Sequence, residues 1–180
     1  LYAGLMIDAQ GKPKALEFNC RMGDPETQPI LMRLKSDLLE VLGAAIDCKL
    51  DTLELQWDRR TALGVVVAAH GYPDAPRKGD AINGLPPEAD DAVVFHAGTA
   101  LDADGVLRTS GGRVLCVTAL ADNVRQAEQR AYDVARGMYF GGVQYRRHSG
   151  HRAVPSTGTP PPTPRPYKHL ELPKRGSVEI

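Results

Sequence analysis

The stretch LEFNCRMGDPETQ, residues 16–28, begins as an alternating apolar and polar run and ends in a polar turn. Successive side chains of a β-strand point to opposite faces, so the run predicts a strand with two different faces. We expect the apolar face to belong to the core, with Leu16, Phe18 and Cys20. The other face would then carry Glu17, Asn19 and Arg21. From alternation alone, the simplest interpretation is a half-buried strand with a polar outer side.

The chemistry of the polar face favours a binding site. Residues two apart in a strand lie ~7 Å apart, so Glu17 and Asn19 can both direct an oxygen atom at one hard cation. Arg21 adds a planar guanidinium that suits phosphate oxygens. The turn behind it leads to a helix start, where anions bind but where acidic residues and an N-capping threonine are also ordinary. The residues predict a Mg²⁺ and phosphate site and leave the reaction open.

Residues on both sides of this stretch predict a hairpin and a helix. The runs 1–7 and 14–20 are separated by a segment with Gly11 and Pro13, which is typical of a β-hairpin. From Thr27 or Gln28 onward, apolar residues recur at helical spacing as far as residue 46. The spacing therefore predicts one helix of four turns after the turn at 23–26.

The region after Trp57 changes to short strands separated by turns. We expect strands at 62–70, 78–82, 92–97, 105–108, 113–119 and 142–146, and a helix at 123–139. His70 and His96 are interpreted as structural residues at strand ends. The segment 109–112 is compatible with a backbone anion nest or with a tight hairpin turn.

Composition limits the class of protein. The 22 basic and 22 acidic residues among 180 cancel, so no global charge favours nucleic acid or an anionic membrane. The three cysteines are widely spaced, which supports neither a disulfide framework nor a zinc site and fits the reducing cytoplasm. No apolar run approaches the ~20 residues of a membrane span. Because the sequence starts at Leu1 inside a predicted strand, we expect a fragment that lacks its original N-terminus.

Several motifs together resemble the phosphoribosylamine–glycine ligases, also called glycinamide ribonucleotide synthetases, of the ATP-grasp superfamily. The similarity covers residues 1 to about 153. The motifs are LEFNCRMGDPETQPILMRLKSDLLE (16–40), HGYP (70–73), VFHAGT (94–99), TSGGRVLCVTA (109–119), the helix at 127–132 and YRR (145–147). They follow the order in which family members carry them.

The resemblance implies a reaction that the residues alone do not. Such enzymes use ATP to join glycine to 5-phosphoribosylamine, through a glycyl phosphate, in de novo purine synthesis. By position, Glu17 and Asn19 match ligands of Mg²⁺ or Mn²⁺, and Arg21 would stabilise charge on the transferred phosphoryl group. The residues implied to hold the acceptor substrates are Asp24, Pro25, Glu26 and Thr27.

The resemblance also implies an α+β fold in two parts. Residues 1–56 would be the final hairpin and helix of an ATP-grasp domain, and 57–153 a small β-rich C-terminal domain. Residues 154–180 hold seven of the 14 prolines and resemble nothing in the family, so we expect a disordered or polyproline-II tail. The family's usual YRRDIG is replaced here by YRRHSG at 145–150. Since the parts that grip ATP are absent, we expect this chain alone to be inactive.

Two other functions remain open. The chain could be a non-catalytic binding module whose PPPTPRP segment, residues 160–166, docks on an SH3-like partner. It could also belong to another ATP-grasp ligase that joins a carboxylate to an amine, because similar metal-binding motifs recur in that superfamily. Dependence of the full-length protein's activity on glycine and 5-phosphoribosylamine would separate the two ligases. An open reading frame upstream of Leu1 that encodes a glycine-rich ATP-binding region would argue against the binding module.

Overall fold

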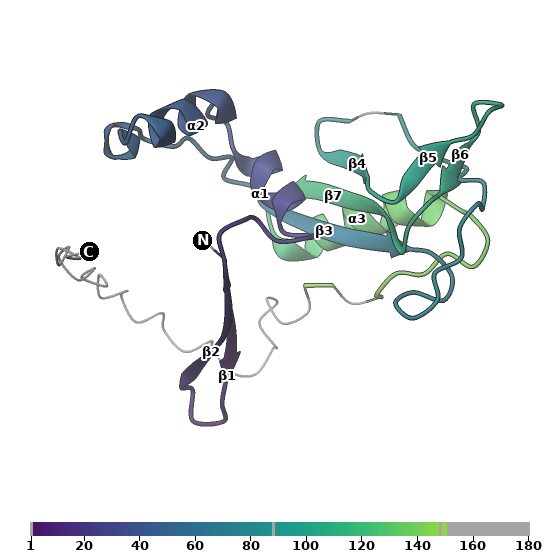
Figure 1. Ribbon diagram of the computed structural model, residues 1–180, viewed down its shortest axis with the longest axis horizontal. Helices are drawn as coiled ribbons and strands as arrows, with labels where there is room; N and C mark the ends of the chain where they lie inside the picture. Colours follow the sequence, from purple (N-terminus) through teal and green to yellow (C-terminus); the bar gives the residue numbers. More distant parts are fainter. Residues whose placement is uncertain (1, 88, 148, 151–180) are drawn as a thin grey trace, which may run out of the picture.

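The computed structural model describes residues 2–87, 89–147 and 149–150 (Figure 1). In chain order its elements are β1 (Tyr2–Ile7), β2 (Pro13–Asn19), α1 (Thr27–Arg33), α2 (Leu38–Ile46), the 3-10 turn η1 (Leu50–Thr52), β3 (Thr61–Ala68), β4 (Ala92–His96), β5 (Thr99–Leu101), β6 (Leu107–Thr109), β7 (Arg113–Ala121) and α3 (Val124–Gly137). This mixture of helices and antiparallel sheets confirms the α+β class. The Pro-rich segment and the state expected for it lie outside the described residues.

The centre of the fold is a three-stranded antiparallel sheet in the order β3-β7-β4. Strand β7 is its middle strand, and every residue from 114 to 120 is buried. Such a run needs cover on both faces, because alternate side chains point to opposite sides. The predicted strands at 62–70, 92–97 and 113–119 correspond to β3, β4 and β7.

Helix α3 covers one face of this sheet. Asn123 begins the helix by accepting a hydrogen bond from the backbone N–H of Gln126 at 3.0 Å, which is an N-cap. The helix buries small and apolar residues against the inward side chains of β3 and β7, and these form the core, with Ala127, Ala131, Val134, Leu63, Val65, Val67, Leu115 and Val117. The predicted helix at 123–139 is confirmed.

Helix α1 lies on the opposite face, and the single helix predicted for 27–46 is wrong. Leu34 leaves the helical conformation at ψ 118° and forms a β-bridge with Trp57. Asp37 then caps α2 by accepting from Leu39 N at 2.7 Å. Apolar spacing continues across the break, so periodicity could not reveal it. The contact with residue 57, remote in sequence, overrides local helix propensity.

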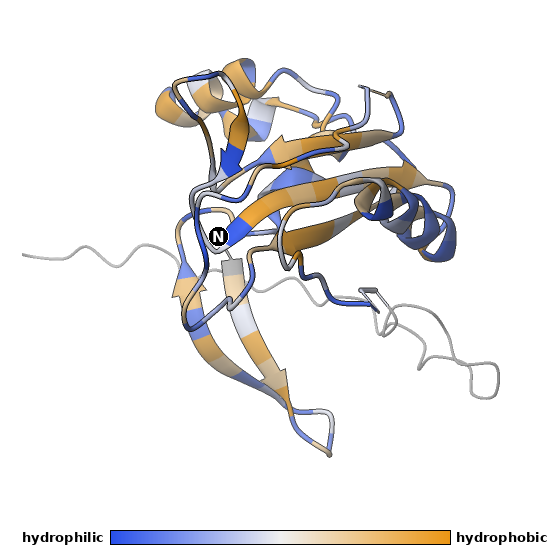
Figure 2. Ribbon diagram, turned by 90° about the vertical axis from the view of Figure 1, so that its right-hand side faces the viewer, coloured by the Kyte–Doolittle hydropathy of each residue, from blue (hydrophilic) through white to orange (hydrophobic). Residues whose placement is uncertain are grey.

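The hairpin β1–β2 is confirmed, but its expected burial is wrong. It projects away from the three-stranded sheet (Figure 1), and both of its strands carry apolar residues (Figure 2). Leu16 and Phe18 are each 65% exposed, and Cys20 is exposed as well. Within the described residues nothing covers this face. Alternation showed that the strand has an apolar face, but not whether another part of the protein covers it.

Two further strand predictions are corrected. In the segment 78–82 only Ala81 forms a bridge, to Arg108, and in 142–146 only Gln144 does, to Ala68. The predicted strand at 105–108 appears as β6, which pairs with β5, a strand that was not predicted. No helix in the described part of the chain is long and apolar enough to cross a membrane.

Candidate functional site

The proposed metal ligands lie on one face of β2. Glu17 pairs with Gly4 and Asn19 with Tyr2 in the antiparallel register, and the two positions are separated by one residue. A Cβ atom at Gly4 would come within 3.0 Å of Glu17 Cγ, so this glycine leaves room for the Glu17 side chain to lie across β1. Strand geometry therefore brings Glu17 and Asn19 to the same side, as the sequence predicted.

These two side chains fit a hard cation that keeps other ligands. Glu17 is exposed, Asn19 is half-buried, and within the described residues neither side chain makes a hydrogen bond or ion pair. No group of three or more His, Cys, Asp or Glu that could hold a metal occurs in the described part of the chain. A carboxylate and a carboxamide alone suit Mg²⁺ or Mn²⁺, which retain water and phosphate oxygens as further ligands.

Arg21 follows directly after this strand. Its side chain is exposed, and Nη1 donates to the backbone oxygen of its neighbour Met22 at 2.9 Å. The remaining guanidinium N–H groups have no partner among the described residues, so they are available to an anion. Arg21 thus lies between the Glu17–Asn19 face and the turn that comes next.

The turn at 23–27 is closed by its own residues. The backbone N–H of Thr27 donates to Gly23 O at 3.0 Å, and the Thr27 hydroxyl donates to the same oxygen at 2.6 Å. The Glu26 carboxylate folds back over Gly23, where a Cβ atom would overlap it. Glu26, rather than Thr27, is the N-cap residue of α1, and its side chain makes no capping hydrogen bond. A side chain at position 23 would displace the Glu26 carboxylate from this place.

Arg113 joins this turn to the central sheet. Its Nη1 donates to Asp24 O at 2.6 Å and lies 3.2 Å from Asp24 Oδ2, while its Nε donates to Tyr72 OH at 2.9 Å. The guanidinium carbon is also 6.0 Å from the centroid of the Tyr72 ring, within the range of a cation–π contact. The hydrogen bond with Tyr72, and then the charge of Asp24, raise the pKa of Arg113.

The segments that resembled family motifs meet around Arg113. Ala69 N donates to Gly112 O at 2.8 Å, Gly98 N donates to Arg113 O at 2.8 Å, and Ser110 N donates to Gly98 O at 2.7 Å. A Cβ at Gly112 would overlap the Tyr72 ring. The segments 70–73, 94–99 and 109–114 are thereby held together behind the turn. Because 109–112 links β6 to β7, which lie in two different sheets, this segment is not a hairpin turn, and Ser110 N is already paired with Gly98 O.

The sequence did not single out Arg113 or Tyr72. The signal that was present is a cation at the start of the longest buried strand, next to two glycines. A charged residue in that place needs a partner, but the sequence alone does not say that the partner is Asp24. His70 is exposed, and His96 Nδ1 lies 3.2 Å from Thr99 Oγ1. Both histidines lie at or just beyond strand ends, as predicted.

Helix α1, which follows the turn, packs against β3 and β7 of the sheet. A Cβ at Gly64 would lie 3.2 Å from Pro29 Cγ and 3.4 Å from Cys116 Sγ, so the helix and the thiol both border this glycine. Cys116 is 3% exposed, and burial, followed by the charge of Asp24, raises the pKa of its thiol. The oxygen Oε1 of Gln28 is buried without a hydrogen-bond partner among the described residues.

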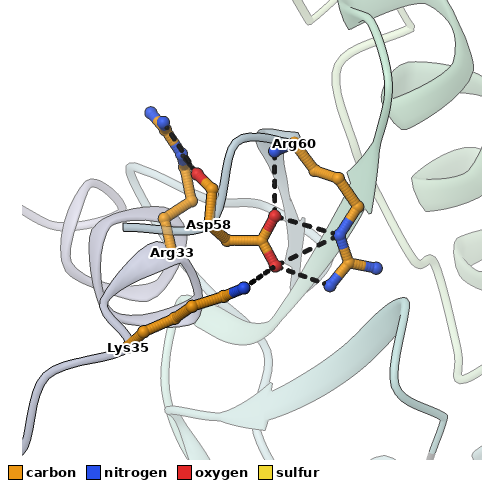
Figure 3. A network of polar contacts seen from close by, with 4 residues as sticks. All are labelled: Arg33, Lys35, Asp58 and Arg60. Atoms are coloured by element: carbon orange, nitrogen blue, oxygen red, sulfur yellow. Dashed lines mark hydrogen bonds and ion pairs between the residues drawn. The ribbon is translucent and has the colours of Figure 1, made fainter. Parts of the chain in front are cut away.

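A charged network fixes the end of α1 (Figure 3). Arg33 donates from Nε and Nη2 to Asp58 O at 3.1 and 3.0 Å. The Asp58 carboxylate accepts from Arg60 Nη2 at 2.8 Å and lies 3.9 Å from Lys35 Nζ. The hydrogen bonds from Arg60 hold the pKa of Asp58 well below its usual range. Contacts to the central sheet region therefore hold both ends of α1. Arg113, at the start of β7, binds Asp24 in the turn before α1, and Arg33, at the end of α1, binds Asp58 just before β3.

Comparison with known proteins assigns the chain to a family. Residues 62–152 match the family described as "Phosphoribosylglycinamide synthetase, C domain". The phosphoribosylamine–glycine ligase of Ralstonia nicotianae is 66% identical over 154 residues, which are 86% of this chain and 36% of that protein. The ligase of Neisseria meningitidis serogroup A is 53% identical over the same shares. The crystal structure of the Thermotoga maritima ligase has a TM-score of 0.64 at 39% identity, over 81% of this chain and 35% of that one. The chain therefore spans about a third of the length of these relatives.

Proposed function

Because the chain belongs to the phosphoribosylglycinamide synthetase C-domain family, we propose that it forms the metal- and phosphate-facing part of a phosphoribosylamine–glycine ligase. The complete enzyme joins glycine to 5-phosphoribosylamine and converts ATP to ADP and phosphate. One observation carries this proposal: Glu17 and Asn19 share an open strand face that leads directly to Arg21 and to the turn at 23–27.

Each residue of this face has a role that follows from its chemistry. Glu17 and Asn19 hold Mg²⁺ or Mn²⁺, which neutralises charge on the ATP phosphates when bound. Arg21 directs its free N–H groups at the phosphoryl group that passes from ATP to the glycine carboxylate. The ribosylamine nitrogen then forms the amide bond as phosphate leaves. Neither step requires a covalent bond to the protein.

The acceptor substrates bind at the turn. Asp24 and Glu26 supply carboxylates suited to an amine, and Pro25 fixes the backbone between them. Thr27 closes the turn through Gly23 O and keeps its hydroxyl oxygen free to accept a further hydrogen bond. The side chain of Asp24 is 65% exposed, so a ligand can reach it.

The two-part organisation is part of the proposal. Residues 1–56 complete an ATP-grasp domain, 57–153 form the C-terminal β-rich domain, and the enzyme works in the cytoplasm on small molecules without nucleic acid or a membrane. The exposed apolar residues of the first part support this division, because large uncovered apolar patches are unusual on a finished surface. They are Leu5, Ile7, Leu16, Phe18, Leu39, Leu42 and Ile46.

A chimera tests the function. The 154 matched residues of the Ralstonia nicotianae ligase are replaced by those of this chain, and ADP release is followed with and without each substrate. We expect turnover that requires glycine, 5-phosphoribosylamine and a divalent cation, and none from the 180-residue chain alone. A chimera with the circular dichroism spectrum of the parent enzyme but no activity would contradict the proposal. So would activity with another amine or carboxylate in place of these substrates, or turnover by the isolated chain.

A further inference from the structure

The hairpin that carries Glu17 and Asn19 has little of its own to fix its position. In the described residues β1 and β2 pair only with each other, and the hairpin points away from the sheet (Figure 1). Its connection to the rest of the fold is the segment 20–26, which leads into α1. The placement of the metal-facing side chains relative to the sheet therefore depends on what holds this segment.

Among the described residues, one side chain makes the polar contacts that join segment 20–26 to the central sheet. Arg113 binds the backbone oxygen of Asp24, approaches its carboxylate, and binds Tyr72 OH through a different nitrogen. The planar guanidinium can satisfy these directions at once, whereas a lysine ammonium on a flexible stem cannot reproduce the fork. Tyr72 is itself held against Gly112, the residue before Arg113.

We infer that Arg113, supported by Tyr72, is a positioning residue that sets the turn at 23–27, and with it the Glu17–Asn19–Arg21 face, against the central sheet. The functional half of this inference rests on the function proposed above. The structural half does not, because the position of the turn can be measured without activity. Arg113 acts through Asp24 and is not assigned a contact with substrate.

Cys116 reports whether the turn and α1 stay in place. Cys116 is 3% exposed, and its Sγ atom borders Gly64 together with Pro29 of α1. If the turn and α1 lift away from the sheet, Cys116 becomes accessible while the α3 side of the core stays packed. Cys20 and Cys48 are exposed and would react in every state, so both are replaced by serine in the background protein.

The first measurement is the rate at which an aromatic disulfide reagent modifies Cys116 in the folded 180-residue chain. We expect Arg113→Ala and Arg113→Lys to raise this rate roughly tenfold or more, the factor that follows from losing one hydrogen bond to a charged group. Tyr72→Phe keeps the ring and loses only the hydroxyl, so it should give a smaller rise. Arg108→Ala is the matched control, because Arg108 pairs with Asp102 and Gly79 O instead.

An unchanged Cys116 rate in Arg113→Ala, or a wild-type rate in Arg113→Lys, would overturn the inference. If Arg113→Ala unfolds, as judged by circular dichroism, the lysine and Tyr72→Phe variants decide the matter. The second measurement uses the chimera: Arg113→Lys should raise KM for glycine at least about fivefold with a smaller change in kcat, as expected for lost substrate positioning. A lower kcat with an unchanged KM for glycine and an unchanged requirement for the divalent cation would indicate a smaller amount of folded enzyme, and thus a purely structural role, and would contradict it. An inactive parent chimera would refute the proposed function while the Cys116 result still stands.

Discussion

Arg113 and Asp24 are 89 positions apart in the chain, yet Arg113 Nη1 donates to Asp24 O at 2.6 Å and lies 3.2 Å from Asp24 Oδ2. This contact connects the start of the longest buried strand to the turn that follows the candidate metal ligands. It links the central sheet to the residues that we propose bind the metal ion and the substrates.

The carboxylate half of this contact should contribute little to stability. Both side chains are partly exposed, at 39% for Arg113 and 65% for Asp24, and exposed ion pairs contribute at most about 1 kcal/mol. We expect Asp24→Asn to lower the free energy of unfolding in urea by less than about 1 kcal/mol, because the backbone oxygen still accepts from Arg113. A loss several times larger would mean that the carboxylate, and not the carbonyl, holds the turn.

Acid should weaken the anchor at the end of α1. The pKa of Asp58 is lowered mainly by hydrogen bonds from Arg60, so the ionised carboxylate stabilises the fold above the ordinary aspartate pKa of about 4. That contribution is lost as pH falls below about 4 towards the lowered pKa. We expect Asp58→Asn to lower the urea midpoint at pH 7, and the difference from wild type to shrink on acidification.

A difference between Asp58→Asn and wild type that stayed constant or grew as pH fell would contradict this assignment. Lys35→Ala is the matched control. Lys35 lies 3.9 Å from Asp58 and is 61% exposed, so its removal should change the midpoint and its pH dependence only slightly.

The Tyr132 hydroxyl should matter more than any surface pair. Tyr132 is 6% exposed, donates to Arg146 O and accepts from Ser149 N at 2.9 Å, so it ties the end of the described chain to α3. We expect Tyr132→Phe to cost about 1–3 kcal/mol, because it leaves polar backbone groups without their partner. Tyr139→Phe, at a residue that is 63% exposed, should cost under about 0.5 kcal/mol. Equal losses in thermal denaturation would contradict the assigned role.

Two glycines should respond in opposite directions to alanine. Gly43 lies inside α2, and a Cβ added there would have no neighbouring atom within 4 Å, so Gly43→Ala should stabilise by about 0.5–1 kcal/mol. At Gly64 a Cβ would press on Pro29 and Cys116 at 3.2 and 3.4 Å, so Gly64→Ala should destabilise by about 1–3 kcal/mol. Stabilisation by Gly64→Ala would show that α1 does not pack on this face.

Local patterns in the sequence predicted the parts of this structure that depend on local rules. Alternation placed Glu17 and Asn19 on one face, and apolar spacing found β3, β7 and α3. The same spacing missed the break at Leu34, because that break is set by a bridge to Trp57 far along the chain. It also assigned Leu16 and Phe18 to a core, since alternation reports two faces but not whether either one is covered.

The tie between Arg113 and Asp24 lay beyond sequence reasoning for a related reason. The resemblance marked both segments, but pairing across 89 positions is a property of how the sheet, α1 and the Tyr72 loop meet. Composition, spacing and motif order do not report which segments are in contact in the folded chain. The structure identifies Asp24 as the partner of Arg113, and this contact explains how the turn is held against the sheet.

The most direct test of the proposed metal site is the activity of the chimera after Glu17→Gln, compared with Glu54→Gln at an exposed position outside the candidate site. If Glu17 holds the divalent cation, Glu17→Gln should lower kcat/KM roughly a hundredfold or more, because losing a few kcal/mol of charge stabilisation costs about tenfold per 1.36 kcal/mol. It should also raise the Mg²⁺ or Mn²⁺ concentration needed for half-maximal rate, while Glu54→Gln changes neither. Equal activity and equal metal dependence in the two variants would contradict the central claim.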